Sequence, residues 1–480
     1  MHSLFFVYAP SVINGIRIMN YTPIIVLLLM LAPLCLGADE FDFDKGRMNK
    51  ETLRAYASRA VSCLPLLQTE EEVFLEDLRM LLSIKAKYIG RAATYSWSGN
   101  MSRAAIEDHY RLVAERARIC HEKDPQMMLQ AGVFEIIYRD TANNTPIPAY
   151  VFEAFGKKPE DRHFRYDSMI KTYGPDAADR RPWGNDASAV PDIRKPETQM
   201  YFYWQITRYI DAGIEAFHLG QAEKMAGYDP KNYVYWDKVT ALARKYAKKH
   251  ARRGLALFDC HTAITSGGMK VGDRHICDII GAGIVPDETE YRDGAYMCRI
   301  CDYKDCWLQW IGRSAGGLHP LGFRVENNFT ILEFDNYGGK GKPWEPTFQG
   351  FYNWGFDDIT WFALQPSWYR DLFLMECDIF LKNNNLDSEG RQQYFLQPPC
   401  RRLVTEKTTL AYKIADMSRK DDIIRLAELE KASCRLEGDT LIITGSHDYR
   451  CNTPSDRCPN GFGQEEIIKR IFAGENARRK

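Results

Sequence analysis

The segment 197–261 alternates helix-forming and strand-forming stretches, and this alternation restricts the fold more than any other feature of the chain. In residues 197–210 apolar side chains recur every three or four positions, as on one face of a helix. The apolar run 214–218 follows, and a second helical pattern at 233–252 precedes a second apolar run at 255–261. Helices that alternate with short, nearly continuous apolar strands indicate a parallel sheet covered by helices.

The same rhythm continues on both sides of this segment. Further strands are predicted at 87–97, 128–138, 275–284, 329–334, 357–364 and 392–396, and further helices at 102–120, 147–155, 369–382 and 421–432. The chain therefore contains about eight units of a strand and a helix. This number predicts an α/β fold of the (β/α)8 TIM-barrel type, with long loop insertions. We place the barrel at 85–432, after N-terminal helices at 38–84 that pack on it, and a small C-terminal cap at 433–480.

The N-terminus carries the pattern of a secretory signal peptide. Residues 22–37 (TPIIVLLLMLAPLCLG) are apolar, end in small residues and precede an acidic stretch. We assign 1–37 to the signal, with Met19 as an alternative start, and expect a secreted or periplasmic protein. Ala32-Pro33-Leu34-Cys35 departs from a lipoprotein signal, so a cell-surface lipoprotein is the weaker prediction. No later run could cross a bilayer.

Net charge and cysteine content bear on nucleic-acid binding, disulfide bonds and metal binding. The formal net charge of −1 argues against a general nucleic-acid binder. Of the 13 cysteines, those outside the signal are expected to pair in part as disulfides in an oxidising compartment. The spacing Cys298-x2-Cys301-x4-Cys306 could instead hold zinc, which leaves a structural metal as the alternative there.

Polar residues end several predicted strands, where a barrel builds its active site. Glu333 and Asp259 are the predicted acid/base and nucleophile, because cleavage of a glycosidic bond uses two carboxyl groups that face one cavity. Aromatic side chains near strand ends are predicted to stack on sugar rings. The other predicted substrate-binding residues are Glu135, Glu215, His218, Gln221, His261, Asp335, Trp97 and Trp361.

Three other interpretations use the same residues. Glu215, His218, Asp259, His261 and Glu333 offer oxygen and nitrogen ligands for a metal-dependent hydrolase or isomerase. A non-catalytic glycan-binding protein would keep the aromatic residues alone. A purely structural role would pair the acids with Arg91 or Lys87 of the first predicted strand. The sequence contains no phosphate-binding loop and no dinucleotide fingerprint, and we predict no cofactor.

The signal, the barrel rhythm and the acids at strand ends resemble the secreted (β/α)8-barrel glycoside-hydrolase-like proteins. The resemblance is at superfamily level and covers about residues 85–430. It implies an enzyme that hydrolyses a glycosidic bond in a poly- or oligosaccharide, with carbohydrate as its partner. In the best-known clan of these barrels the fourth strand ends in an Asn-Glu pair, whereas the fourth predicted strand here ends in Asp259-Cys260-His261.

Overall fold

The computed structural model describes residues 39–171, 187–261, 268–283, 289–292, 295–298, 315–334, 359, 362–363, 367–384, 386–402, 409–413, 433–438, 440–444 and 449–475. Several predicted features lie outside these residues: the signal at 1–37, the helix at 421–432, Asp335, Trp361, Cys301 and Cys306. The elements described below belong to one unit, Phe41–Lys480.

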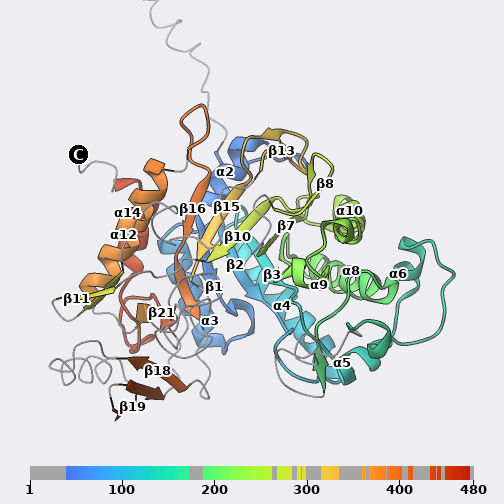
Figure 1. Cartoon of the computed structure of the whole chain (residues 1–480), viewed down its shortest axis with the longest axis horizontal. Coiled ribbons are helices and arrows are strands. Elements are labelled where there is room, and N and C mark those ends of the chain that lie inside the picture. The colour runs from blue at the N-terminus through green and yellow to red at the C-terminus, as the bar shows by residue number, and fades with distance from the viewer. Residues whose placement is uncertain are drawn as a thin grey trace, which may run out of the picture. The chain divides into compact units, whose positions relative to one another are not determined.

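A ten-stranded sheet organises this unit (Figure 1), in the order β16-β15-β10-β7-β6-β3-β2-β1-β17-β21. Its strands are β1 (Ala60–Cys63), β2 (Tyr88–Ala93), β3 (Met128–Gly132), β6 (Ala216–His218), β7 (Leu257–His261), β10 (Ile279–Gly283), β15 (Phe329–Glu333), β16 (Tyr394–Gln397), β17 (Pro399–Arg402) and β21 (Tyr449–Arg450). All neighbours run parallel except β17 and β21. Only Pro398 separates β16, which pairs with β15, from β17, which pairs with β1, so the sheet is strongly curled.

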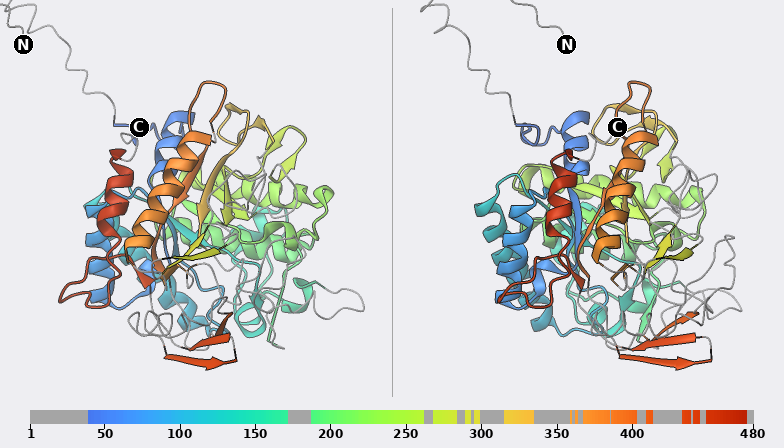
Figure 2. Two further views of the ribbon diagram at one scale, coloured as in Figure 1. Left: turned by 60° about the vertical axis from the view of Figure 1, so that its left-hand side comes forward. Right: turned by 90° about the vertical axis from the view of Figure 1, so that its left-hand side faces the viewer.

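Helices lie outside the sheet (Figure 2), and the α/β class is confirmed. They are α2 (Lys50–Ser58), α3 (Glu71–Ser83), α4 (Arg103–Lys123), α5 (Arg139–Asn143), α6 (Ala149–Ala154), α8 (Pro196–Asp211), α9 (Ala222–Met225), α10 (Tyr233–His250), α12 (Ser367–Asn384) and α14 (Glu465–Phe472). None of the described helices is long and apolar enough to cross a membrane.

The connections on either side of β10 depart from a regular helix-after-strand pattern. Their described parts contain β8 (Lys270–Val271), β9 (Arg274–His275), β11 (Thr289–Arg292), β12 (Ala295–Cys298), β13 (Gly317–Leu318) and β14 (Arg324–Val325). Two further small sheets pair β4 (Ile137–Tyr138) with β5 (Ser188–Ala189), and β20 (Thr440–Thr444) with β18 (Thr409–Lys413) and β19 (Ser433–Glu437).

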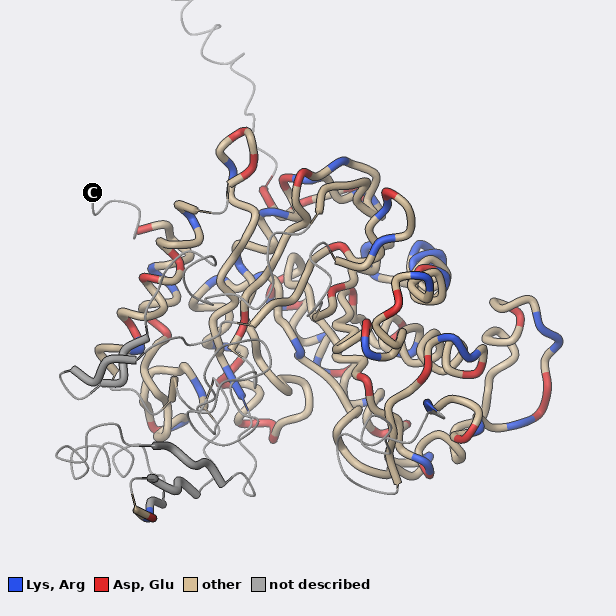
Figure 3. The backbone as a smooth tube through the Cα atoms, viewed as in Figure 1, with Lys and Arg blue, Asp and Glu red and all other residues tan. Residues whose placement is uncertain are grey.

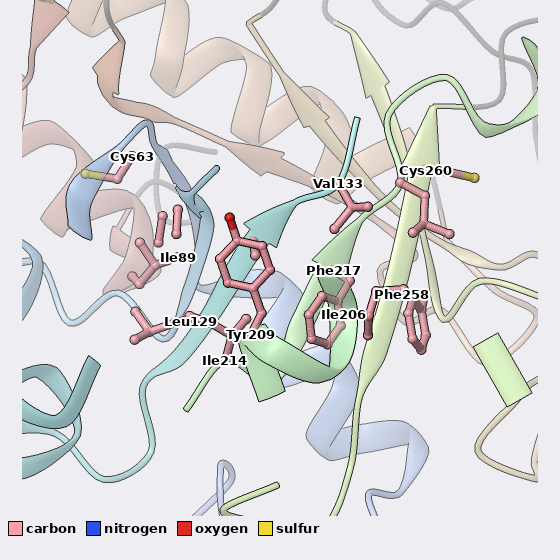
Figure 4. Packing of buried hydrophobic residues seen from close by; sticks show 14 of the residues in the cluster. Cys63, Ile89, Leu129, Val133, Ile206, Tyr209, Ile214, Phe217, Phe258 and Cys260 are labelled. Atoms are coloured by element: carbon pink, nitrogen blue, oxygen red, sulfur yellow. The ribbon is translucent and has the colours of Figure 1, made fainter. Parts of the chain in front are cut away.

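Two apolar clusters lie on the two faces of the curled sheet. The inner cluster takes a side chain from each of the parallel strands β1 to β16: Ala60, Tyr88, Met128, Ala216, Leu257, Ile279, Phe329 and Phe395. The outer cluster alternates with it, since Phe217 and Phe258 point to the other side and pack with Ile206 of α8 (Figure 4). One face of each strand is therefore left to line the interior of the curled sheet.

Two segments differ from their predictions. Residues 60–63 form β1 inside the range where we expected only helices, and Ile359, Phe362 and Ala363 are helical where we expected a strand. Apolar periodicity does not distinguish a short buried strand from a buried helical turn, and that ambiguity produced both errors. β21, which lies in the segment 433–480 that we assigned to a small C-terminal cap, joins the main sheet.

Eight of the cysteines in the described residues are buried free thiols: Cys63, Cys120, Cys260, Cys277, Cys377, Cys400, Cys451 and Cys458. One close pair, Cys260 and Cys277, has its sulfur atoms 3.5 Å apart, which is well beyond the roughly 2.05 Å of a disulfide bond. The described residues therefore do not supply the disulfides that we expected.

Candidate functional site

Polar side chains from the carboxyl-terminal parts of five parallel strands meet inside the curled sheet. We call them the carboxylate–histidine cluster: Arg91 of β2, Gln130 of β3, His218 of β6, Asp259 and His261 of β7, and Glu333 of β15. Each is between 1% and 9% exposed. The cluster lies further along the strands than the inner apolar cluster, which fills the amino-terminal part of the interior.

The alternation of β7 explains how this strand supplies two members. Leu257 belongs to the inner apolar cluster, so Asp259 and His261 face the same interior, and Phe258 and Cys260 face the helices. Gly281 of β10 lies opposite His261. A Cβ atom on Gly281 would come within 3.1 Å of His261 Cδ2 and 3.3 Å of Asp259 Oδ2, so the glycine leaves room for both side chains.

Glu333 is held by two partners. His261 Nε2 lies 2.7 Å from Glu333 Oε1, and the Arg91 guanidinium donates a hydrogen bond to the same oxygen. Arg91 reaches this position from a left-handed backbone, with φ of 56°, where β2 shifts register against β3. Residues with a side chain seldom adopt this conformation, and strain of this kind is concentrated at functional sites.

Asp259 is surrounded differently, although it lies close by. His218 Nδ1 is 2.7 Å from Asp259 Oδ2, and the Gln130 amide donates to Asp259 Oδ1. Burial raises the pKa of Asp259 well above its usual range, and the charge of Glu333 raises it further, while His261 and Arg91 lower it in part. Asp259 therefore favours its neutral form at a pH where an exposed aspartate is ionised.

The two imidazole–carboxyl pairs are in direct contact. The ring centroids of His218 and His261 lie 4.6 Å apart, and the ring planes are at an angle of 71°. The interior thus places side by side a carboxyl group whose pKa is raised, Asp259, and one that binds arginine, Glu333. Environments that separate the protonation of two neighbouring acids are typical of acid–base catalysis.

Three further predicted residues lie next to the cluster. Glu135 accepts hydrogen bonds from the Gln221 backbone N–H at 2.9 Å and from its side-chain amide at 3.3 Å. Trp97 is 42% exposed. Its ring centroid lies 6.3 Å from that of Phe134, and the Phe134 centroid lies 5.5 Å from that of His218. Phe134 thus lies between Trp97 and the cluster, and the stacking of Trp97 on a sugar ring stays a prediction.

Glu215 is not brought to this site. It precedes β6, at the opposite end of the strand from His218, and its carboxylate binds Arg252 at 2.7 Å and Arg253 at 2.8 Å. The prediction that Glu215 binds substrate did not take its position into account. A residue that precedes a parallel strand lies at the amino-terminal end of the sheet, whereas the cluster lies toward the carboxyl-terminal end. Lys87, considered as a structural partner of the acids, binds Asp124 at 2.7 Å instead.

Two members of the cluster were not assigned to the site from the sequence. Arg91 was considered only as a structural ion-pair partner of the acids, and it does bind Glu333. Gln130 was missed, although it lies in an apolar strand that ends at Gly132. Side chains two residues apart in a strand point to the same face, so Gln130 faces inward like Met128. Counting in steps of two from the strand end could have found it.

Three members could together hold a metal ion. His218, His261 and Glu333 each offer a ligand atom, and these atoms lie within 4.8 Å of one another. Asp259 on Nδ1 of His218 resembles the carboxylate that commonly orients a metal-binding histidine. Arg91, which donates to Glu333, places a competing positive charge in the same space.

Comparisons with known proteins give distant matches only. No protein-family model matches the sequence, and no curated protein does. Among solved structures, a Thermus thermophilus α-galactosidase in complex with p-nitrophenyl α-D-galactopyranoside matches at 12% identity and a TM-score of 0.29, over 48% of this chain and 44% of that one.

Two further matches concern other glycoside hydrolases. Isomaltodextranase from Arthrobacter globiformis T6 in complex with panose matches at 10% identity and a TM-score of 0.35, over 71% of this chain and 53% of that one. A family 27 β-L-arabinopyranosidase from Geobacillus stearothermophilus in complex with arabinose matches at 12% identity and a TM-score of 0.33, over 82% and 83%. The chain spans less than two thirds of the α-galactosidase and of the isomaltodextranase. TM-scores this low establish neither a common fold nor a common activity.

Proposed function

We propose that this protein is a hydrolase that cleaves a glycosidic bond inside a (β/α)8-type barrel. The observation that carries the proposal is the adjacency of two carboxyl groups in contrasting environments, Glu333 on Arg91 and Asp259 on His218. The barrel is closed in this proposal through the continuous segment of β16 and β17, which pairs with β15 on one side and β1 on the other. We further propose that the protein is exported and acts on an extracellular or periplasmic glycan.

Glu333 acts as the carboxylate in this mechanism. Arg91 supplies the positive charge that an ionised carboxylate needs in a buried site, and His261 orients it by a second hydrogen bond to Oε1. Glu333 then attacks the anomeric carbon of the sugar or takes a proton from the water that does so. In either case one water molecule is consumed for each glycosidic bond that breaks.

Asp259 and His218 together hold the proton that the leaving oxygen needs. Burial, followed by the charge of Glu333, raises the pKa of Asp259, which favours a proton on the pair. His218 passes this proton to the glycosidic oxygen and takes its replacement from Asp259 through Nδ1. The leaving sugar departs as an alcohol, and the proton released by water restores the pair.

The test measures reducing-end release by the purified protein on a panel of poly- and oligosaccharides, beside the variants Glu333→Gln and Asp259→Asn. We expect each variant to lose at least about 10²-fold in kcat, the scale of acid–base catalysis. Glu153→Gln, a substitution on the exposed side of α6, is the matched control and keeps full activity. Circular dichroism and thermal melting establish that each variant is folded. Sugar release that persists in folded Glu333→Gln contradicts the proposal.

A metal-dependent hydrolase or isomerase is the second candidate, favoured by the mutual distances of His218, His261 and Glu333. It predicts that EDTA abolishes activity and that Zn²⁺ or Mn²⁺ restores it. It also predicts that elemental analysis of the purified protein finds about one metal ion per chain, lost in the variant His261→Ala. EDTA-resistant activity with no bound metal leaves the two-carboxyl mechanism as the explanation.

A further inference from the structure

A cavity lies at the amino-terminal end of β7, away from the carboxylate–histidine cluster. It has a volume of about 880 Å³, within the range of ligand-binding pockets. Leu255 and Ala256, which lead into β7, line it, whereas His261 ends the same strand. His261 lies six positions after Leu255 in extended chain, a distance of roughly 20 Å at about 3.3 Å per residue. This cavity, which we call the basic groove, is therefore separate from the proposed active site.

Helix α10 forms one wall of the groove. Ala241, Arg244, Lys245 and Lys248 line it, and their spacing of three and four places them on one face of the helix. Arg274 of β9 and the turn 320–323 between β13 and β14 also line it. The segment 46–50 completes it, fixed by the hydrogen bond from Gly46 N to Arg253 O at 2.8 Å. Figure 3 shows how densely lysine and arginine occupy α10.

The lining contains six cations and no carboxylate: Arg47, Lys50, Arg244, Lys245, Lys248 and Arg274. Three of these have acidic partners beside the groove: Arg244 binds Asp278, Arg274 binds Asp237, and Lys50 binds Asp387.

The other three, Arg47, Lys245 and Lys248, are exposed, and no ion pair within 4.0 Å joins them to the part of the chain that the structure describes. An excess of three positive charges converges on one groove, in a chain whose net charge is −1. Walls of one charge around a concave surface concentrate ligands of the opposite charge.

The groove also offers apolar surface. Met48, Pro320, Leu321 and Phe323 line it beside the cations, and Leu321 and Phe323 are half-buried against the inner apolar cluster. A ligand that fits must therefore carry several negative charges and also flat apolar faces. A sugar ring that bears carboxylate or sulfate groups has both, since its C–H faces pack on apolar side chains.

We propose that the basic groove binds an anionic saccharide, a chain of uronate or sulfated sugars, outside the catalytic site. The choice of a saccharide over other oligoanions rests on the proposed function, whereas the anionic character follows from the lining alone. The groove holds a neighbouring stretch of the glycan on the protein while the carboxylate–histidine cluster acts elsewhere on it.

Isothermal titration calorimetry with the full chain tests this, with oligogalacturonate and dextran sulfate as probes and neutral dextran as the uncharged comparison. We expect both anionic probes to bind and the affinity to fall at least tenfold between 50 and 300 mM NaCl. The triple variant Arg47→Ser, Lys245→Ser, Lys248→Ser is expected to lose at least tenfold in affinity. The triple variant Lys157→Ser, Lys158→Ser, Lys231→Ser removes the same charge from exposed positions elsewhere and is expected to bind as the original protein does.

Equal losses in the two triple variants, or equal binding of neutral dextran, overturn the proposal. A single-stranded oligonucleotide of equal charge that binds more tightly than either saccharide overturns the choice of ligand. The inactive variant Glu333→Gln is measured as well and is expected to bind the anionic probes unchanged. Binding by a protein that releases no sugar from any glycan would therefore support the groove and refute the proposed activity.

Discussion

Two buried acids on neighbouring parallel strands, Glu215 before β6 and Asp259 within β7, show how surroundings change the pKa of a carboxyl group. Burial alone would raise the pKa of Glu215, but the charges and hydrogen bonds of Arg253 and Arg252 offset it and lower that pKa below its usual range. Burial raises the pKa of Asp259, and the negative charge of Glu333 raises it further, with only partial offset from His261 and Arg91. The carboxylate of Glu215 is ionised and binds two arginines, whereas the surroundings of Asp259 favour its protonated form.

Replacing Glu215 by glutamine is expected to lower the free energy of unfolding by about 3 kcal/mol, because two arginines lose a buried charged partner. Urea denaturation at pH 7 measures the loss. The kcat of the folded variant is expected to be unchanged, since Glu215 lies at the far end of β6 from His218.

The pH dependence of that loss checks its cause. A carboxyl group with a lowered pKa stabilises the fold above its unfolded pKa of about 4.3, and the contribution disappears as the pH falls through the lower folded value. The difference between the original protein and Glu215→Gln should therefore shrink below about pH 4.3. A difference that stays constant with pH would attribute the loss to packing rather than to charge.

Asp259 is expected to make stability fall as the pH rises. An aspartate whose folded pKa is raised binds its proton more tightly in the native state, so folding is favoured below the unfolded pKa of about 3.9. That contribution is lost progressively as the pH rises toward the folded pKa. Urea unfolding of the original protein and of Asp259→Asn, from pH 4 to pH 8, measures it. The decline should be weaker in the variant, and an equal decline in both would assign it to another group.

At the scale of elements, the interior of the curled sheet depends on residues small enough to let polar side chains meet. Gly90 of β2 is one such residue. A Cβ atom there would overlap the Gln397 amide nitrogen and lie 3.1 Å from Val61 O, and Gln397 itself donates to Val61 O at 3.1 Å. A side chain at position 90 would therefore break the contact that joins β16 to β1.

The variant Gly90→Ala is expected to lose about 1–3 kcal/mol of stability, the usual cost of overpacking. Adding Gln397→Ala should recover part of that loss, because the shorter side chain vacates the space next to position 90. Thermal and urea unfolding of both single variants and the double variant give the coupling energy. If the stability losses of Gly90→Ala and Gln397→Ala simply added in the double variant, the predicted contact between position 90 and Gln397 would be contradicted.

At the scale of the whole molecule, the C-terminal segment is part of the fold. β21 extends the main sheet beside β17, and α14 packs against α12. Arg450 of β21 and Arg401 of β17 both bind the buried Asp77 of α3, at 2.6 and 3.2 Å. Segments almost 400 residues apart in the sequence thus share one buried charge network.

A chain that ends at residue 432 is therefore expected to lose cooperative unfolding. The buried side chains Ile467, Ile468, Ile471 and Phe472 of α14 contribute roughly 1.5–3 kcal/mol each, a sum comparable with the stability of a whole domain. Differential scanning calorimetry should detect no sharp transition, and trypsin should digest the shortened chain rapidly. A chain that ends at Glu475 is the control and should melt like the original. A sharp transition in both would show that 433–480 is a dispensable cap.

The helices and strands between residues 196 and 261 were predictable because their order is encoded locally. Apolar spacing reports which face of a helix is buried, and a run such as 257–261 alternates its side chains whatever surrounds it. For the same reason Asp259, His261 and Glu333 could be selected as inward-facing residues near strand ends. β1 escaped prediction because a short buried strand has no period of its own that separates it from a helical turn.

The sequence by itself therefore determined the α/β alternation and most of the residues that face the interior. Only the tertiary structure decided which of them meet. Arg91 reaches Glu333 across 242 residues of chain, and Glu215 is turned away to Arg252 and Arg253. The physical reason is that local periodicity records the burial of a side chain, whereas its charged partner is set by strand register and by the direction of the sheet.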